Sequence, residues 1–207
     1  MSLPALTPRT ATAVPVTLSD GGTAALRPLE PDERAPLLEV FAGMSGQSRA
    51  SRYLVPMPRL SEAYLRHLSA TDGLAHVAWL ATVAGRPAGI GRYAVTSEDP
   101  CAVEVALEVV DQHQRRGLGA VLLDAVTTVA AANGVRRLRA TVLPGNEPSR
   151  RLLTRVAIPL RFEDGLLEGT APLRLLDPAR VDRHAVVELA RRTTPAPCDA
   201  HWTAPCA

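Results

Sequence analysis

A short loop with the sequence Gln-Arg-Arg-Gly-Leu-Gly (114–119) has the residue types that bind phosphate groups. It lies between a strand-like segment and a segment with helical periodicity. The first amides of a helix have no acceptor within the helix, and they favour phosphate oxygens. Gly117 and Gly119 let a pyrophosphate approach the backbone, while Arg115 and Arg116 add positive charge. The spacing therefore predicts a site for a phosphate-bearing ligand.

Three kinds of glycine loop compete for this segment. A P-loop needs a lysine, and the chain has none. A dinucleotide-binding loop of an oxidoreductase needs a third glycine where this chain has Leu122. The third pattern, Arg/Gln-x-x-Gly-x-Gly/Ala, is met from Gln114 to Gly119. It is the acyl-CoA loop of the GNAT superfamily of N-acetyltransferases, which the chain resembles over roughly residues 16–175.

Two carboxylates precede the loop. Glu104 and Glu108 are four residues apart in the expected strand, so both project from one face together with Ala106. Val105 and Leu107 point the other way, toward the core. A carboxylate at the mouth of a substrate site can act as a general base. Either glutamate is a candidate for that role; the alternative is a carboxylate facing solvent on a sheet.

Apolar periodicity, turn residues and helix caps predict a mixed α/β domain. Strands are expected at 16–18, 23–27, 76–83, 88–95, 103–110, 137–143, 160–162 and 166–175. Helices are expected at 31–41, 61–68, 117–133, 146–155 and 177–192, and the segment 44–58 is expected to be irregular. Antiparallel strands followed by a strand–helix–strand unit match the GNAT fold. That resemblance implies a mostly antiparallel sheet with one splayed parallel pair, flanked by helices.

Within the superfamily, the chain is similar to bacterial GNAT domains related to Pat-type protein-lysine acetyltransferases. The similar segments are 44–53, 58–61, 75–78 and the strand that carries Glu104. The resemblance implies acetyl-CoA as cosubstrate and a primary amine as acceptor, either a protein lysine or a small molecule. It also implies that Glu104 is the base, with Glu108 as second candidate.

The resemblance implies further contacts with acetyl-CoA. The thioester oxygen and pantetheine arm would meet the backbone near Val109 and Val110. The loop residues from Gln114 to Leu118, then Gly119 and Ala120, would hold the pyrophosphate. Asn146 and Ser149 would contact the coenzyme as well, although Asn146 is equally suited to cap a helix.

One position departs from the family pattern. Many GNAT enzymes place a tyrosine after Asn-x-x-Ala/Ser-x-x-Leu as the acid that protonates the leaving thiolate. Here Asn146 begins that pattern, but Leu153 takes the place of the tyrosine. A GNAT module that binds acyl-CoA without turnover therefore stands as an alternative to an enzyme.

Composition and charge argue against several other functional classes. The net charge is +2 and aromatic residues make up 3% of the chain, so neither a nucleic-acid nor a base-stacking surface is indicated. No run of 18 apolar residues predicts a membrane span. The start of the chain lacks the pattern of a signal peptide, which makes the cytoplasm the expected location. Cys198, His201 and Cys206 match no common metal-binding spacing.

The expected organisation is one catalytic domain with appendages. A flexible lead covers 1–15, the GNAT domain 16–176, a C-terminal helix 177–192 and a disordered tail 193–207. A monomer and a homodimer are both compatible with this organisation.

Overall fold

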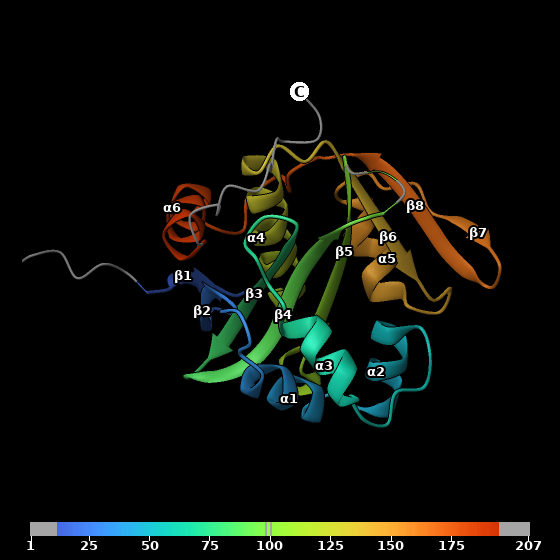
Figure 1. The fold of residues 1–207 in the computed structure, drawn as a ribbon, viewed down its shortest axis with the longest axis horizontal. Coiled ribbons are helices and arrows are strands. Elements are labelled where there is room, and N and C mark those ends of the chain that lie inside the picture. The colour runs from blue at the N-terminus through green and yellow to red at the C-terminus, as the bar shows by residue number, and fades with distance from the viewer. Residues whose placement is uncertain (1–11, 98, 100, 195–207) are drawn as a thin grey trace, which may run out of the picture.

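An eight-stranded sheet runs through the computed structural model of the protein, which describes residues 12–97, 99 and 101–194. The strands are β1 Val14–Thr17, β2 Thr23–Pro28, β3 His76–Val83, β4 Arg86–Val95, β5 Ala102–Val109, β6 Arg137–Val142, β7 Arg161–Glu163 and β8 Leu166–Pro172. They lie in the order β1-β2-β3-β4-β5-β6-β8-β7. All neighbours are antiparallel except β5 and β6, which are parallel. The mixed α/β sheet expected from the sequence is confirmed (Figure 1).

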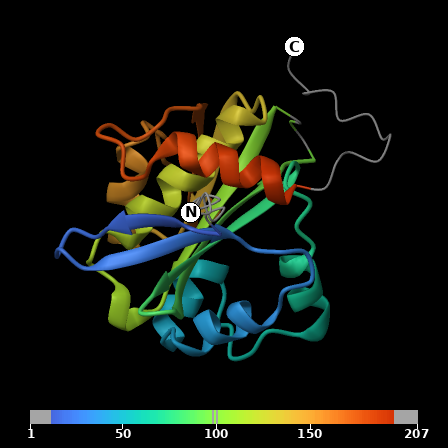
Figure 2. The same ribbon diagram turned by 90° about the vertical axis from the view of Figure 1, so that its left-hand side faces the viewer.

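Helices cover both faces of this sheet. They are α1 Ala35–Ala42, α2 Gly46–Tyr53, α3 Glu62–Ser69, α4 Leu118–Ala132, α5 Glu147–Thr154 and α6 Arg183–Thr193, with a 3-10 turn η1 at Asp111–His113. Figure 2 shows α4 and α6 on one side of the strands and α1 to α3 on the other. The buried apolar side chains accordingly form two clusters, one on each face.

Helix α4 is buried almost all round because the sheet covers one side of it and α6 the other. Two glycines of β4 permit its close approach. A Cβ on Gly91 would lie 3.1 Å from the Leu122 Cβ, and one on Gly89 would lie 3.1 Å from the Leu122 Cδ1. Such distances are tighter than ordinary side-chain packing allows. The two glycines therefore help to set where the first turn of α4 lies relative to the end of β5.

The segment after β8 is tied to α4 by a buried carboxylate. Asp124 is fully buried and accepts the backbone amides of Arg180 and Val181 at 2.5 and 3.2 Å. Its other oxygen pairs with the Arg183 guanidinium at 2.7 Å. These contacts hold 180–181 against α4, and Asp182 then caps α6 by accepting the Ala185 amide. The helix expected from residue 177 therefore begins only at Arg183.

Two other expectations about the N-terminal half need correction. Helix α1 begins at Ala35 rather than at residue 31. The expectation that 44–58 is irregular is wrong, because α2 occupies Gly46–Tyr53 with Ser45 as its cap. The Ser45 hydroxyl accepts the Ser48 amide at 3.2 Å. The polar composition of this helix conceals it, since Tyr53 is its one buried residue.

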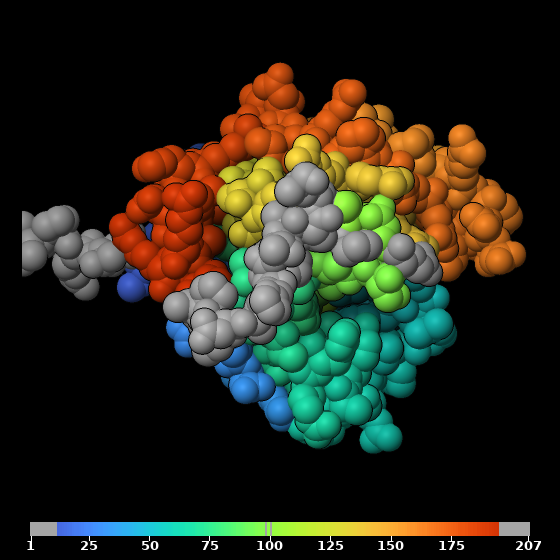
Figure 3. Space-filling view, turned by 45° about the horizontal axis from the view of Figure 1, so that its top comes forward, coloured from blue at the N-terminus to red at the C-terminus, as the bar shows by residue number. Residues whose placement is uncertain are grey.

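The expected domain limits also shift. Strand β1 begins at Val14, inside the segment expected to be a flexible lead, and α6 packs on the same core as α4. Residues 1–11 and 195–207 of the expected lead and tail lie outside the described residues. The β7–β8 hairpin stands out at one end of the molecule (Figure 3), where Phe162 is 70% exposed. Of the helices described, none has the length and apolar character to cross a bilayer.

Candidate active site

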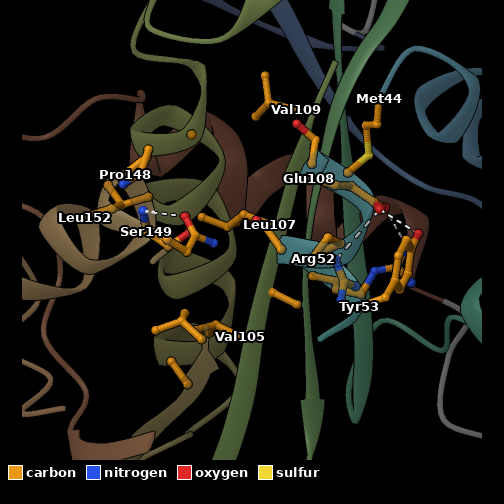
Figure 4. A pocket seen from close by; sticks show the side chains of 18 of the residues that line it. Met44, Arg52, Tyr53, Val105, Leu107, Glu108, Val109, Pro148, Ser149 and Leu152 are labelled. Atoms are coloured by element: carbon orange, nitrogen blue, oxygen red, sulfur yellow. Dashed lines mark hydrogen bonds and ion pairs between the residues drawn. The ribbon is translucent and has the colours of Figure 1, made fainter. Parts of the chain in front are cut away.

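The parallel ladder between β5 and β6 is short. It joins three residue pairs and ends where Glu104 lies opposite Arg139. Beyond that pair the strands part, although β5 continues to Val109 and β6 to Val142. The opening belongs to a cavity of about 870 Å³ between β5, β6, α2, α5 and the start of α4 (Figure 4). This is the splayed parallel pair expected from the sequence.

The first turn of α4 lines the cavity through Gly117, Leu118, Gly119 and Ala120. Gly117 precedes the helix with φ of 85°, a left-handed conformation that favours glycine. The Ala120 amide donates to the Gly117 carbonyl at 3.0 Å, so the amides without a helical acceptor belong to Leu118 and Gly119. A Cβ on Gly119 would meet only the Leu152 Cδ2, at 3.6 Å. This turn can accommodate phosphate oxygens.

Gln114 lines the cavity, but its side chain is engaged by the protein. Its Nε2 lies 3.2 Å from the Ser48 Oγ, 3.1 Å from the Val109 carbonyl oxygen and 3.0 Å from the Asp111 Oδ1. Asp111 in turn accepts the Ser45 amide at 3.1 Å. Gln114 thus ties the loop to α2 and to the end of β5, and its contribution to the site is to hold these elements together.

The two arginines of the loop have different surroundings. Arg115 lines the cavity and has φ of 63°, an uncommon conformation for a residue with a side chain. Arg116 is not among the cavity residues; its Nε pairs with Asp20 Oδ2 at 2.5 Å and its Nη1 contacts His113 at 3.0 Å. Asp20 belongs to the β1–β2 turn. Arg116 therefore anchors the loop, while Arg115 supplies positive charge at the cavity.

The end of β5 offers one of the two amides expected to meet the thioester. The Val110 amide donates to the Ala88 carbonyl at 2.9 Å, and Val110 is buried among apolar residues of α1 and β4. Because hydrogen bonds alternate along an antiparallel pair, the Val109 amide faces away from β4, toward the opening. Val109 lines the cavity and Val110 does not. Only the former can serve a ligand there.

Helix α5 forms the opposite wall. The Asn146 side-chain oxygen accepts the Ser149 amide at 3.3 Å, which makes Asn146 the cap of this helix (Figure 4). Both residues line the cavity, as do Leu152 and Leu153. Leu153 is 5% exposed and offers no proton.

Glu104 lies at the point where β5 and β6 part. Its side chain is exposed, lines the cavity and makes no hydrogen bond or ion pair with any described residue. Its carboxylate is therefore free to contact a molecule in the cavity.

Glu108 is on the same face of β5 but is buried. Helix α2 covers this end of the strand, so the carboxylate is 4% exposed. It accepts a 3.0 Å hydrogen bond from the Tyr53 hydroxyl and pairs with Arg92 at 3.3 Å and with Arg52 at 3.7 Å (Figure 4). The expected alternation along β5 is present, but the face expected to meet solvent is covered here. The Glu108 carboxylate is therefore paired with two arginine side chains and is not exposed to solvent.

Burial changes the titration of the groups around Glu108. Desolvation, with a smaller contribution from the Glu108 charge, raises the pKa of Tyr53 well above its ordinary value, so the hydroxyl remains a donor. Desolvation likewise lowers the pKa of Arg92, although the Glu108 carboxylate opposes this.

Aromatic side chains line the cavity beyond this cluster. The rings of Tyr64 and His67 lie 6.1 Å apart, and His67 stacks on His76 at 5.8 Å. The His76 Nδ1 is 2.9 Å from the Ala70 carbonyl oxygen. Burial, with the charge of Arg92, lowers the pKa of His76. A neutral His76 therefore donates through Nδ1 and leaves Nε2 as an acceptor.

Three residues of the site were not predicted from the sequence: Arg52, Tyr53 and Arg92. One feature of the sequence could have indicated Arg92, because it is a charged residue within a strand of mostly small and apolar residues. Arg52 and Tyr53 belong to the unrecognised helix α2. Within the described residues, no group of three or more His, Cys, Asp or Glu side chains is placed to hold a metal ion.

Comparisons with known proteins agree with this geometry. Residues 45–157 match the model of the acetyltransferase (GNAT) family. An acetyltransferase of Pseudomonas aeruginosa is 31% identical over 139 residues, which is 65% of this chain and 74% of that protein. Acetyltransferase Pat of Mycolicibacterium smegmatis is 28% identical over 147 residues; the match covers 70% of this chain and 44% of Pat.

Solved structures show the same fold. The GNAT domain of S. lividans PAT superposes with a TM-score of 0.72 at 30% identity, covering 83% of this chain and all of that domain. The acetyltransferase fold of yncA from Salmonella typhimurium, solved with its cofactor acetyl-CoA, has a TM-score of 0.59 at 17% identity, covering 73% of this chain and 94% of yncA.

Proposed function

Because the chain belongs to the acetyltransferase (GNAT) family, we propose that it transfers the acetyl group of acetyl-CoA to a primary amine within the cavity between β5 and β6. The observation that carries the proposal is the opening of the β5–β6 pair directly before the helix turn at Gly117. A strand edge suits an extended pantetheine arm, and the helix turn suits a pyrophosphate.

The described residues fit acetyl-CoA in this arrangement. The Leu118 and Gly119 amides would bind the pyrophosphate, with Arg115 adding charge, while Asn146 and Ser149 border the coenzyme from α5. The Val109 amide would donate to the thioester oxygen as negative charge develops there. Gln114 and Arg116 would hold the loop in shape.

In the proposed reaction, the amine nitrogen attacks the thioester carbon, the carbon–sulfur bond breaks and coenzyme A leaves as the thiol. The amine must first be neutral, and Glu104 accepts its proton directly or through water. Leu153 cannot protonate the departing thiolate, so the second proton, which the amine nitrogen loses as the amide forms, reaches the sulfur through water. Glu108 is assigned to positioning, because its oxygens hold Arg52, Arg92 and Tyr53.

The acceptor of this proposal is either a protein lysine or a small amine. The resemblance of segments 44–53, 58–61 and 75–78 to Pat-type protein-lysine acetyltransferases supports a protein lysine. The matched region spans less than half the length of the M. smegmatis Pat protein, so the acceptor of that whole protein is not carried over to this chain.

The test combines binding and turnover. Calorimetry should show acetyl-CoA binding, and thiol release should depend on an added amine from a panel of small amines and lysine peptides. Substituting Gly119→Glu should abolish both without unfolding the protein. Acetyl-CoA binding without release for any amine would refute the enzymatic proposal, and absence of binding would refute the cofactor site.

A further inference from the structure

The cluster around Glu108 carries unequal charge. Two guanidinium groups, those of Arg52 and Arg92, share the single carboxylate of Glu108, which leaves one positive charge without a partner in the cluster. The side chains are 12% and 6% exposed, and buried charges are normally paired. Both arginines line the cavity, so the missing negative charge can be supplied by a bound molecule.

Hydrogen bonding in the cluster is incomplete too. Arg92 donates to the Leu68 carbonyl at 2.9 Å and to Glu108, but its Nε is buried without an acceptor. Arg52 makes no hydrogen bond to any described residue, and its Nε is likewise buried without an acceptor. Its guanidinium lies over the Tyr53 ring at 4.9 Å and reaches Glu108 only at 3.7 Å. Buried donors without an acceptor are uncommon in native proteins, so each one needs an explanation.

We propose that the acceptor is a small amine that also carries a carboxylate, and that Arg52, backed by Arg92, binds this carboxylate. The inference rests on the proposed function, since it assumes that an amine is acetylated in this cavity. A guanidinium matches a carboxylate through two parallel hydrogen bonds. One carboxylate would balance the single unpaired charge, whereas a dianionic phosphate would exceed it.

The arrangement of the two glutamates agrees with such a molecule. Glu104 stands free beyond the cluster on the same face of β5, where it can attract an ammonium group and take its proton. The Arg52–Arg92 pair lies further along the strand, beside Glu108. A molecule that carries both an amine and a carboxylate can therefore meet the opposite charge at each end. A lysine side chain brings no such negative group.

The first experiment compares matched pairs of acceptors, each an amino acid and its amide, at saturating acetyl-CoA. The panel covers α-amino acids, amino acids with longer spacing between amine and carboxylate, and a lysine peptide. Amidation lowers the pKa of an α-amine, so intrinsic reactivity at neutral pH favours the α-amide. We expect at least one acid to exceed its amide in kcat/KM by about 10- to 100-fold, as for loss of a charged hydrogen bond. Amides or the peptide matching or exceeding every acid would overturn the proposal.

The second experiment changes Arg52. Arg52→Gln should raise the KM for the preferred acid by about 10- to 100-fold and leave the KM for acetyl-CoA unchanged. Arg52→Lys, which keeps the charge but not the planar fork, should fall between the two. Arg59→Gln removes the same charge from an exposed position outside the cavity and should behave as wild type.

The outcomes separate this proposal from the proposed function. If amines are acetylated but Arg52→Gln keeps the full preference for the acid over its amide, the carboxylate site is wrong and the acetyltransferase proposal stands. If no amine is acetylated, the proposed function itself fails. Thermal unfolding of each variant shows whether it is folded, and Arg52→Lys provides the comparison should Arg52→Gln unfold.

Discussion

Glu104 and Arg139 form the last pair of the parallel ladder between β5 and β6, and the cavity opens directly beyond them. Arg139 pairs with Glu168 of β8 at 3.0 Å. The free carboxylate of Glu104 therefore stands at the entrance to the opening, while Glu108 is enclosed four residues further along the same strand.

The first prediction concerns the base. Glu104→Gln keeps the size of the side chain but cannot accept a proton, so kcat should fall by about 10²- to 10⁴-fold with little change in acetyl-CoA affinity. The loss of wild-type activity at acidic pH should also disappear in the variant. Steady-state kinetics over a pH series measures both. Glu163→Gln, on the exposed strand β7, is the matched control. Near-normal turnover of Glu104→Gln would assign the proton to water or to another group.

The second prediction concerns the helix turn. Gly119→Glu should abolish acetyl-CoA binding, because a carboxylate there would repel the pyrophosphate and fill its space. Gly119→Ala should fold and still bind, since the added Cβ meets only Leu152 at 3.6 Å. Calorimetry on both variants measures the affinity. Gly119 is a better position for this test than Gly117, because the φ of 85° at Gly117 disfavours any side chain and a substitution there would also strain the backbone. Equal affinity of both variants for acetyl-CoA would place the pyrophosphate elsewhere.

The third prediction concerns stability. Glu108→Gln should destabilise the protein by about 3–5 kcal/mol, because it leaves Arg92 buried without its carboxylate. Adding Arg92→Met should recover part of this loss, since the unpaired charge is then gone. Urea unfolding of the two single variants and the double variant gives the coupling free energy. Strictly additive effects would show that the two side chains do not stabilise each other.

The fourth prediction concerns pH. Burial holds the pKa of His76 below its ordinary value of 6.5, so the unfolded chain takes up this proton more readily than the folded protein. The contribution of His76 to stability is therefore complete above pH 6.5 and is lost as the pH falls toward the lower folded pKa. His76→Asn keeps a donor for the Ala70 carbonyl but does not titrate. Its unfolding free energy should decline less than that of wild type between about pH 7 and about pH 5. If the unfolding free energies of wild type and His76→Asn decline in parallel, His76 is not the source of the pH dependence.

Much of the architecture could be predicted because it depends on local patterns. The strands around 76–110 and the helix from Leu118 have strong apolar periodicity, and Gly134 ends that helix region as expected. Helix α2 was missed because its polar residues show no apolar stripe. The start of α6 was misplaced because Asp124, more than fifty residues earlier, holds the preceding backbone.

The backbone of the turn 114–119 could be predicted from the sequence, because such a turn is built from consecutive residues whose types prescribe its conformation; that it binds a pyrophosphate remains our proposal. The sequence also determined that Glu104 and Glu108 share one face of β5, since side chains alternate along a strand. The difference between these two carboxylates could not be predicted, because it arises from tertiary contacts. Helix α2 brings Arg52 and Tyr53 over Glu108, and β4 brings Arg92 beside it, while Glu104 is left open. Burial and charge pairing depend on segments that meet only in the folded chain.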